Sequence, residues 1–279
     1  MIKYYTRACN FYYGSTSKDK IKKKLSLPLN GNNLISFDTI EIITRKNKKK
    51  FHISKIKNLN YKIKNKIKKD IKLITKKKKF KGLNFLNFPI LMGIVNLTPD
   101  SFSDGGKYSK KNSAFKHANY LIKKGCKIID IGGESTRPGA KDVGKIVEWN
   151  RINKTLKKIR KLNIFISLDT RKSWIMEKGV ESKVNLINDV SGFDYDPNTL
   201  NILKKHNIPF IIHHMRGTPK TMQKKPNYKN VLLDVYDFFE SKIKKIRSHG
   251  IKHNNIILDP GIGFGKNLKH NMTLISSIS

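Results

Sequence analysis

Six short apolar segments in the second part of the chain each end in a polar side chain. The six groups are Asn96, Asp130, Asp169, Asn188 with Asp189, His213 with His214, and Asp259. A carboxylate accepts two parallel hydrogen bonds from an amino-pyrimidine edge, and a carboxamide meets an adjacent N–H and carbonyl. The pattern therefore predicts a site for a flat heterocycle that offers both donors and acceptors.

Loops rich in Gly, Ser and Thr follow two of these segments, and one of them contains Thr136 and Arg137. A hydroxyl, a guanidinium and nearby backbone amides suit phosphate oxygens. The stretch Asp259–Lys266 is also rich in glycine, but it lacks the GxGxxG spacing of a dinucleotide site. The sequence has no His/Cys metal spacing and no Ser-His-Asp arrangement, so the site predicted is one for a heterocycle and a phosphate ester.

Apolar strands alternate with amphipathic helices from Pro89 onward. The expected strands are Ile90–Val95, Lys127–Ile131, Ile164–Leu168, Val184–Ile187, Pro209–Ile212 and Ile256–Leu258. Six helices are expected between and after these strands. The first begins near Ser113 and ends before Gly125, and the second carries the apolar stripe Ile146, Trp149, Ile152, Leu156 and Ile159. The third spans Ser173–Lys178, the fourth starts at Asp196-Pro197, the fifth runs from Val231 to Gly250, and the sixth begins near Leu268. This alternation implies a parallel sheet.

An open doubly wound sheet and a (β/α)₈ barrel both fit that alternation. A doubly wound sheet concentrates its ligand at one switch point, whereas a barrel collects residues from nearly every strand at one mouth. Polar groups at all six strand ends favour the barrel. Because a barrel takes roughly 250 residues, we expect only about six βα units here, with the last two strands absent.

Residues 1–88 form a lysine-rich extension before the domain of residues 89–279. Leu34–Ile43 reads as a strand, and the aromatic residues near the start are numerous enough to pack. We expect a small appended subdomain, and a basic arm without a core is the alternative. No catalytic group is assigned to this part of the chain.

The net charge of +39 suggests an anionic partner, but 51 of the 59 basic residues are lysines spread over every helix-like segment. Nucleic-acid binding predicts clustered arginines and aromatics, so a solvated surface that draws in anionic substrates is preferred. No apolar run is long enough for a membrane span. Two cysteines, Cys9 and Cys126, cannot build a disulfide framework, which favours the cytoplasm.

Two long stretches carry a family resemblance. Met92–Gly106 (MGIVNLTPDSFSDGG) and Asp130–Gly139 (DIGGESTRPG) resemble, in order and spacing, the two signatures of dihydropteroate synthase. The resemblance covers about residues 89–279, and the leader is similar to extensions of some bacterial members. It implies a pterin-binding barrel that joins 6-hydroxymethyl-7,8-dihydropterin pyrophosphate to p-aminobenzoate and releases pyrophosphate with Mg²⁺, and it also implies a homodimer.

The resemblance assigns roles residue by residue. Asn96 would hold Mg²⁺ and, with Thr136 and Arg137, the diphosphate. The pterin ring would contact Asp169, Asn188, Asp259 and Met215. The p-aminobenzoate pocket would contain Phe102, Thr136, Pro138, Gly263 and Phe264, with Ser101 and Asp104 on the first loop. The residues assigned to catalysis are Asn96, Thr136 and Asp104. Asp130 and Glu134 are interpreted as scaffolding, and the histidines as structural or surface groups. Lys266 is one lysine among 51.

Three other functions stay open. The family's later Ser-Arg-Lys motif and Arg-x-His pair are not in this sequence, so an inactive or partner-dependent pterin-binding chain is the main alternative. A corrinoid-linked pterin methyltransferase shares the fold, but the two signature loops match the synthase more closely. A basic nucleic-acid binder is the alternative from another class.

Overall fold

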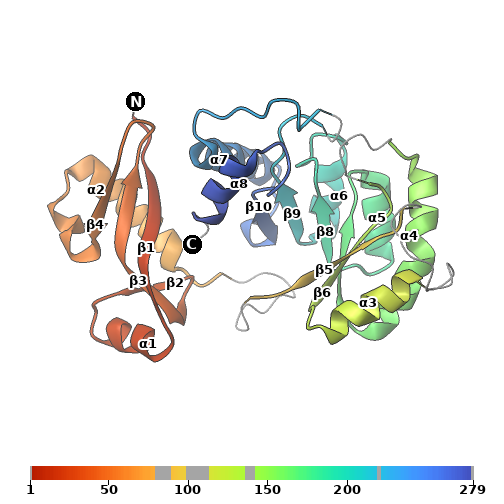
Figure 1. Cartoon of the computed structure of the whole chain (residues 1–279), viewed down its shortest axis with the longest axis horizontal. Coiled ribbons are helices and arrows are strands. Elements are labelled where there is room, and N and C mark those ends of the chain that lie inside the picture. Colours follow the sequence, from red (N-terminus) through yellow and green to blue (C-terminus); the bar gives the residue numbers. More distant parts are fainter. Residues whose placement is uncertain (1, 79–88, 99–112, 136–141, 219–220, 278–279) are drawn as a thin grey trace. The chain divides into compact units, whose positions relative to one another are not determined.

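The computed structural model describes residues 2–78, 89–98, 113–135, 142–218 and 221–277. The chain divides into two compact units, residues 1–79 and residues 80–275, each with its own apolar core (Figure 1). Every helix in these described ranges is too short or too polar to cross a lipid bilayer.

The first unit is a four-stranded antiparallel sheet with helices. Its elements are β1 (Tyr5–Tyr13), α1 (Gly14–Lys22), β2 (Leu27–Leu29), β3 (Asn32–Ile43), β4 (Lys48–His52), the 3₁₀ turn η1 (Ile53–Asn58) and α2 (Tyr61–Thr75). The predicted strand Leu34–Ile43 is confirmed as part of β3, which pairs with the other three strands. In α2 the apolar residues recur every three or four positions, so Ile67 reaches a core with Phe37 and Ile40, all fully buried.

The second unit is a parallel α/β structure whose six predicted strands are confirmed. Its strands are β5 (Met92–Asn96), β6 (Ile128–Gly132), β7 (Phe165–Asp169), β8 (Leu186–Asp189), β9 (Phe210–His213) and β10 (Ile256–Asp259). Its helices are α3 (Ser113–Lys123), α4 (Lys145–Ile159), α5 (Ser173–Glu181), α6 (Thr199–His206), α7 (Val231–Ser248) and α8 (Leu268–Ile275), with 3₁₀ turns η3 (Arg160–Leu162) and η4 (His253–Asn255).

The order of the strands follows the barrel pattern. All five strand pairs are parallel, and the sheet runs β5-β6-β7-β8-β9-β10 with no reversal (Figure 1). A doubly wound sheet contains a reversal of strand order, where its ligand binds. The sequential order instead places every strand's carboxyl end at one rim. Among the described strands, β5 and β10 form the two ends of the sheet.

The helix termini agree with the sequence in two places and differ in one. Gly125 and Gly250 follow α3 and α7 with positive φ angles of 99° and 84°, as predicted. The predicted start of a helix with Pro197 in its first turn is wrong, because α6 begins at Thr199. The carboxylate of Asp196 accepts hydrogen bonds from the N–H of Asn198 and from that of Ser173 at the start of α5. Residues 197 and 198 therefore stay in a turn.

The predicted apolar stripe of α4 is correct over its last three members and wrong at its first. Ile152, Leu156 and Ile159 are fully buried, whereas Ile146 is 54% exposed. Six residues before Ile152, a helical side chain points about 120° away from the stripe. The inward position one turn before Ile152 is taken by Glu148, which is completely buried. A charged side chain thus lies in the core beneath the rim of the sheet.

Candidate functional site

The carboxyl ends of β5 to β8 bring three of the predicted residues to one level of the sheet. In the pairing register Asn96 lies opposite Gly132, Gly132 opposite Asp169, and Asp169 opposite Asn188. A Cβ atom on Gly132 would lie 3.2 Å from a carboxylate oxygen of Asp169. The absence of a side chain at Gly132 therefore leaves room for the Asp169 carboxylate. We call this rim, formed by the carboxyl ends of the strands, the mouth.

Burial raises the pKa values of two carboxyl groups at the mouth. Burial, together with the charges of Asp130 and Asp189, raises the pKa of Asp169 well above its usual value. Burial also raises the pKa of Asp130, and the neighbouring charge of Asp259 adds to this. A ligand edge that donates N–H groups would relieve this crowding of negative charge, so the site favours a donor-rich ring.

Asn188 is oriented by a carboxylate and leaves an oxygen free. Its Nδ2 donates to Oδ2 of Asp130 at 3.1 Å, and both residues are buried. The Oδ1 atoms of Asn188 and Asp130 are buried without a hydrogen-bond partner within the described part of the chain. Because buried polar atoms are normally paired, these two oxygens are available acceptors for a ligand. Asp130, interpreted from the sequence as scaffolding, also orients the amide of Asn188 at the mouth.

The carboxyl end of β10 supplies the second half of the site. Asp259 lies opposite His213 in the register, with Oδ2 3.9 Å from Nε2 of that buried ring. Its Oδ1 accepts a hydrogen bond of 2.8 Å from the N–H of Gly261. The ring of Phe264 stands edge-on to His213 at a centroid distance of 4.4 Å. Met215 lies on the loop after β9 and is half-buried. These predicted residues therefore lie around the ends of β9 and β10.

The histidines at the end of β9 are buried and uncharged. Burial lowers the pKa of His213, and burial with the nearby charge of Lys266 lowers the pKa of His214 to about 3. His213 approaches the carbonyl of Val190 through Nδ1 at 3.2 Å. This agrees with the structural role predicted for both residues.

A buried ion cluster, consisting of Glu134, Glu148, Arg171 and Lys172, lies beside Asp169 and was not predicted from the sequence. Nε of Arg171 donates to Oε2 of Glu134 at 3.1 Å, and its Nη2 forms an ion pair with Oε1 at 2.9 Å. The ammonium of Lys172 lies 3.0 Å from Glu134 and 2.7 Å from Glu148. Burial alone would lower the pKa of Lys172, but these hydrogen bonds raise it above its usual value.

The ion cluster joins three elements of the barrel. The hydroxyl of Thr170, the residue after Asp169, donates to Glu148 at 2.7 Å. Glu148 belongs to α4, Glu134 follows β6, and Lys172 precedes α5. The cluster therefore holds the loop after Asp169 against two neighbours. The one sequence signal for it was an acidic residue at an inward position of α4.

Several predicted residues lie outside the described residues. They are Ser101, Phe102, Asp104, Thr136, Arg137 and Pro138. Asn96 and Gly263 are described and exposed. The residues predicted to contact the heterocycle, Asp169, Asn188, Met215 and Asp259, lie in the described part of the chain, and the roles of the other six stay predictions.

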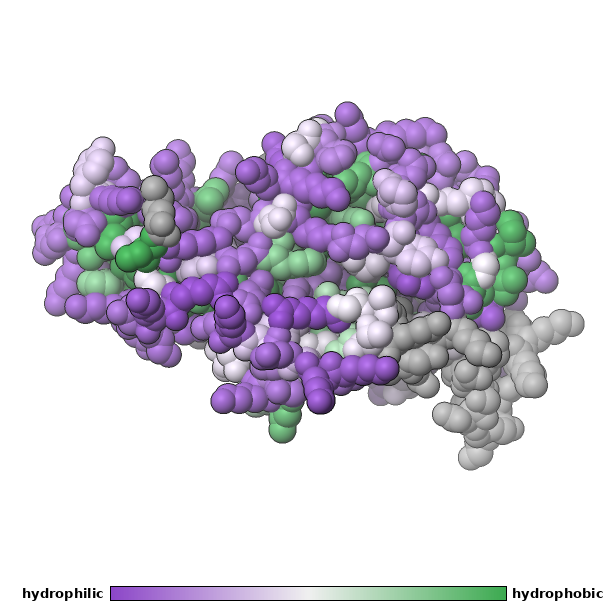
Figure 2. Space-filling view, turned by 90° about the horizontal axis from the view of Figure 1, so that it is seen from above, coloured by the Kyte–Doolittle hydropathy of each residue, from purple (hydrophilic) through white to green (hydrophobic). Residues whose placement is uncertain are grey.

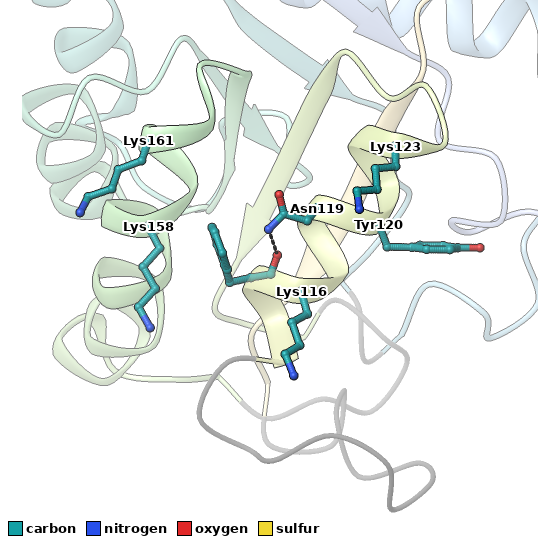
Figure 3. Close-up of a pocket in the computed structure, with 7 residues that line it drawn as sticks. Lys116, Asn119, Tyr120, Lys123, Lys158 and Lys161 are labelled. Atoms are coloured by element: carbon teal, nitrogen blue, oxygen red, sulfur yellow. Dashed lines mark hydrogen bonds between the residues drawn. The ribbon is translucent and has the colours of Figure 1, made fainter.

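A groove of about 760 Å³ lies away from the predicted residues. It is lined by Phe115, Lys116, Asn119, Tyr120, Lys123, Lys158 and Lys161. Figure 3 shows these side chains extending from α3, from the end of α4 and from η3, with Asn119 hydrogen-bonded to the carbonyl of Phe115. None of the predicted site residues lines it. The groove is therefore a positively charged surface feature of the outer helices and is separate from the predicted site at the mouth.

The sequence of the chain matches a family of known proteins. The model of the pterin binding enzyme family matches residues 92–279. The chain is 40% identical over 195 residues to the dihydropteroate synthase of Escherichia coli, covering 70% of this chain and 69% of that relative.

Solved structures give the same result. The dihydropteroate synthase of Yersinia pestis, in a sulfonamide drug complex, superposes with a TM-score of 0.65 at 38% identity, covering 71% of this chain and 72% of that one. The enzyme of Burkholderia cenocepacia, complexed with 7,8-dihydropteroate, has a TM-score of 0.60 at 35% identity, covering 69% and 65%. This chain therefore belongs to the pterin binding enzyme family.

Proposed function

We propose that the chain is a dihydropteroate synthase, which condenses 6-hydroxymethyl-7,8-dihydropterin pyrophosphate with p-aminobenzoate. The observation that carries the proposal is the set of acceptors at the mouth: Asp169, Asn188 and Asp259 end three strands of a barrel related to known synthases. The Burkholderia cenocepacia relative holds 7,8-dihydropteroate, the product that this reaction would form.

The pterin ring would bind to the described half of the site. The carboxylates of Asp169 and Asp259 would accept its N–H groups, and the free Oδ1 of Asn188 would accept a further one. Met215 would pack against the ring. Charge-assisted hydrogen bonds in a partly buried site are worth about 1.5–3 kcal/mol each, which is enough to orient a flat substrate.

The diphosphate and Mg²⁺ would bind at the end of β5. Asn96 is exposed there, and its carboxamide oxygen is a ligand type that Mg²⁺ accepts. Mg²⁺ keeps several waters and uses few protein ligands beside substrate phosphates, so a single Asn fits such a site. When bound, the ion would neutralise the diphosphate that leaves. Thr136 and Arg137 would contact the same oxygens.

The reaction exchanges one bond at the pterin methylene carbon. The C–O bond to pyrophosphate breaks, the amine nitrogen of p-aminobenzoate forms a C–N bond, and that nitrogen then loses a proton to solvent. An electron-rich dihydropterin supports positive charge on the carbon, and the neutral aniline nitrogen needs no general base. Phe102, Thr136, Pro138, Gly263 and Phe264 would form the p-aminobenzoate pocket, with Ser101 and Asp104 beside it. The protein's work would be positioning and charge stabilisation.

The alternative is a pterin-binding chain that is inactive or needs a partner for turnover. It is favoured by exposed apolar side chains on the two end strands of the described sheet: Met92 is 37%, Ile94 58% and Leu258 43% exposed. Apolar residues on the strands of a closed barrel are normally covered. The cytoplasm, consistent with the unpaired Cys9 and Cys126, and a homodimer remain predictions.

A turnover assay separates the two functions. The full chain is mixed with both substrates and Mg²⁺, and pyrophosphate release is followed. Release that disappears in Asn96→Ala supports the synthase. Pterin binding without release supports the alternative, and neither binding nor release would overturn both.

A further inference from the structure

Lys266 is the most completely buried lysine or arginine in the described part of the chain. It is 3% exposed, and its ammonium lies 2.8 Å from the carbonyl of Gly261, 2.9 Å from that of Phe264 and 3.3 Å from that of His214. A fourth contact of 3.0 Å joins it to Nδ1 of His214. Because the pKa of His214 is near 3, this imidazole is neutral and Nδ1 accepts the hydrogen bond.

The contacts of Lys266 are made to backbone and imidazole, not to a carboxylate. Burial lowers the pKa of Lys266 to about 8, so enclosing this ammonium has a cost. An apolar side chain would fill the space without that cost. Unlike an apolar side chain, the ammonium of Lys266 has N–H donors, and here these bind three carbonyl oxygens.

These carbonyls belong to two different loops that approach each other closely. His214 follows β9, whereas Gly261 and Phe264 follow β10. A Cβ atom on Gly261 would lie 2.0 Å from the carbonyl oxygen of His214, and Gly261 has a φ angle of +66°. Only glycine allows this approach. The N–H of His214 also donates to the carbonyl of Asp259 at 2.9 Å, so the two loops are joined on both sides of Gly261.

We propose that Lys266 is a positioning residue that fixes the loop after β10 on the end of β9, and thereby sets the places of Asp259 and Phe264 toward the substrate. The proposal rests on the proposed function for the identity of that substrate. Lys266 itself is enclosed by protein atoms. It acts through the backbone that carries two predicted contact residues.

The test compares Lys266→Met with Lys269→Met, which removes an exposed lysine from the neighbouring helix α8. Amide hydrogen exchange is measured on the full chain without substrate. We expect exchange at least tenfold faster at residues 261–265 in Lys266→Met, and no change in Lys269→Met or in β6 and β7 of either variant. Unchanged exchange at residues 261–265 would overturn the proposal, whatever the enzymatic activity.

The second measurement is the dissociation constant of 6-hydroxymethyl-7,8-dihydropterin pyrophosphate. We expect it to rise at least tenfold in Lys266→Met and to recover partly in Lys266→Gln, which retains two N–H donors. Wild-type affinity in Lys266→Met would refute the positioning role while leaving the synthase assignment intact. A wild-type chain that binds no pterin would instead refute the proposed function, and the exchange comparison would still decide whether Lys266 orders the loop. If Lys266→Met does not fold, Lys266→Gln is compared with Lys269→Gln in both measurements.

Discussion

At the scale of single residues, the mouth depends on acids that are hard to ionise. Asp169 and Asp130 have raised pKa values because they are buried close to other carboxylates, and Asn188 is held by one of them. Strongly raised acid pKa values mark a candidate functional site. Asp169, one of the residues proposed to bind the ring, is therefore also a group whose protonation changes with pH.

Replacing Asp169 with Asn should weaken pterin binding about 10- to 100-fold, since Asn has one acceptor oxygen where the carboxylate has two, and a charge-assisted hydrogen bond worth about 1.5–3 kcal/mol is lost. The wild-type affinity should fall as pH decreases through the raised pKa of Asp169, because the carboxylate is the form that accepts both hydrogen bonds. In Asp169→Asn this pH dependence should be smaller. Calorimetric titration from pH 5 to 8 checks both, and an affinity that is equally steep in pH in the variant would contradict the assignment.

Replacing Asp189 with Asn should stabilise the folded chain at neutral pH. Burial raises the pKa of Asp189 to about 6, above an unfolded value near 3.9. The folded state holds the extra proton between these values, so the stabilising contribution is present below about pH 4 and is lost as pH rises through 6. We expect a gain of about 1–2 kcal/mol at pH 7, or about 2–8 °C in Tm, and little at pH 4. Thermal melting is the measurement, with the exposed Asp194→Asn as control.

At the scale of elements, the ion cluster decides how β6, β7 and α4 meet. Lys172 contacts one acid that follows β6 and another on α4, and Thr170 adds a hydrogen bond next to Asp169. Each contact crosses from one element to another. The cluster is therefore a fixed junction under the mouth.

Replacing Lys172 with Met should destabilise the barrel unit by about 3–5 kcal/mol, because the buried Glu134 and Glu148 lose a partner charge. Urea denaturation followed by tryptophan fluorescence measures the change. The matched control is Lys178→Met, whose exposed pair with Glu181 should contribute less than about 1 kcal/mol. Equal losses in the two variants would show that the ion cluster is not a structural junction.

At the scale of the whole molecule, the chain is strongly basic. The chain carries a net charge of +39, and the face in Figure 2 is mostly hydrophilic. A positive field raises the rate at which anionic substrates arrive, and salt screens that field. Under the proposed function, the surface charge would act on the diphosphate of the substrate, and the acids at the mouth would act on its ring.

The affinity for the pterin pyrophosphate should accordingly fall several-fold between about 0.05 and 0.5 M salt. The affinity for the uncharged 6-hydroxymethyl-dihydropterin should change by less than about twofold, since screening acts on the charged group. Titrations of both ligands across this salt range make the comparison. An equal salt dependence for the two ligands would remove the field as an explanation.

We also propose that residues 1–88 are dispensable for ring binding, because no site residue lies in them. A chain beginning at Pro89 should bind the pterin pyrophosphate within about twofold of the full chain at high salt. A larger loss, in a shortened chain whose circular dichroism shows it folded, would assign the first unit a part in the site.

The sequence by itself determined the strands, most helix ends and the residues at the mouth. These features depend on local rules: apolar runs define strands, glycines with positive φ follow helices, and a polar residue directly after a parallel strand must lie at the rim. For Asp169 and Asn188 the position along the chain already fixes the position in the sheet.

Only the tertiary structure decided which charged residues are buried. Glu148 and Ile146 are two residues apart on α4, yet the charged one faces the core because Lys172 and Thr170, distant in sequence, offer it partners. The sequence does not distinguish Lys266 from the other lysines. It is distinguished by its contacts with the carbonyls of two loops, which only the folded structure brings together. Burial of a charge depends on partners supplied by other elements, and a linear pattern does not contain those contacts.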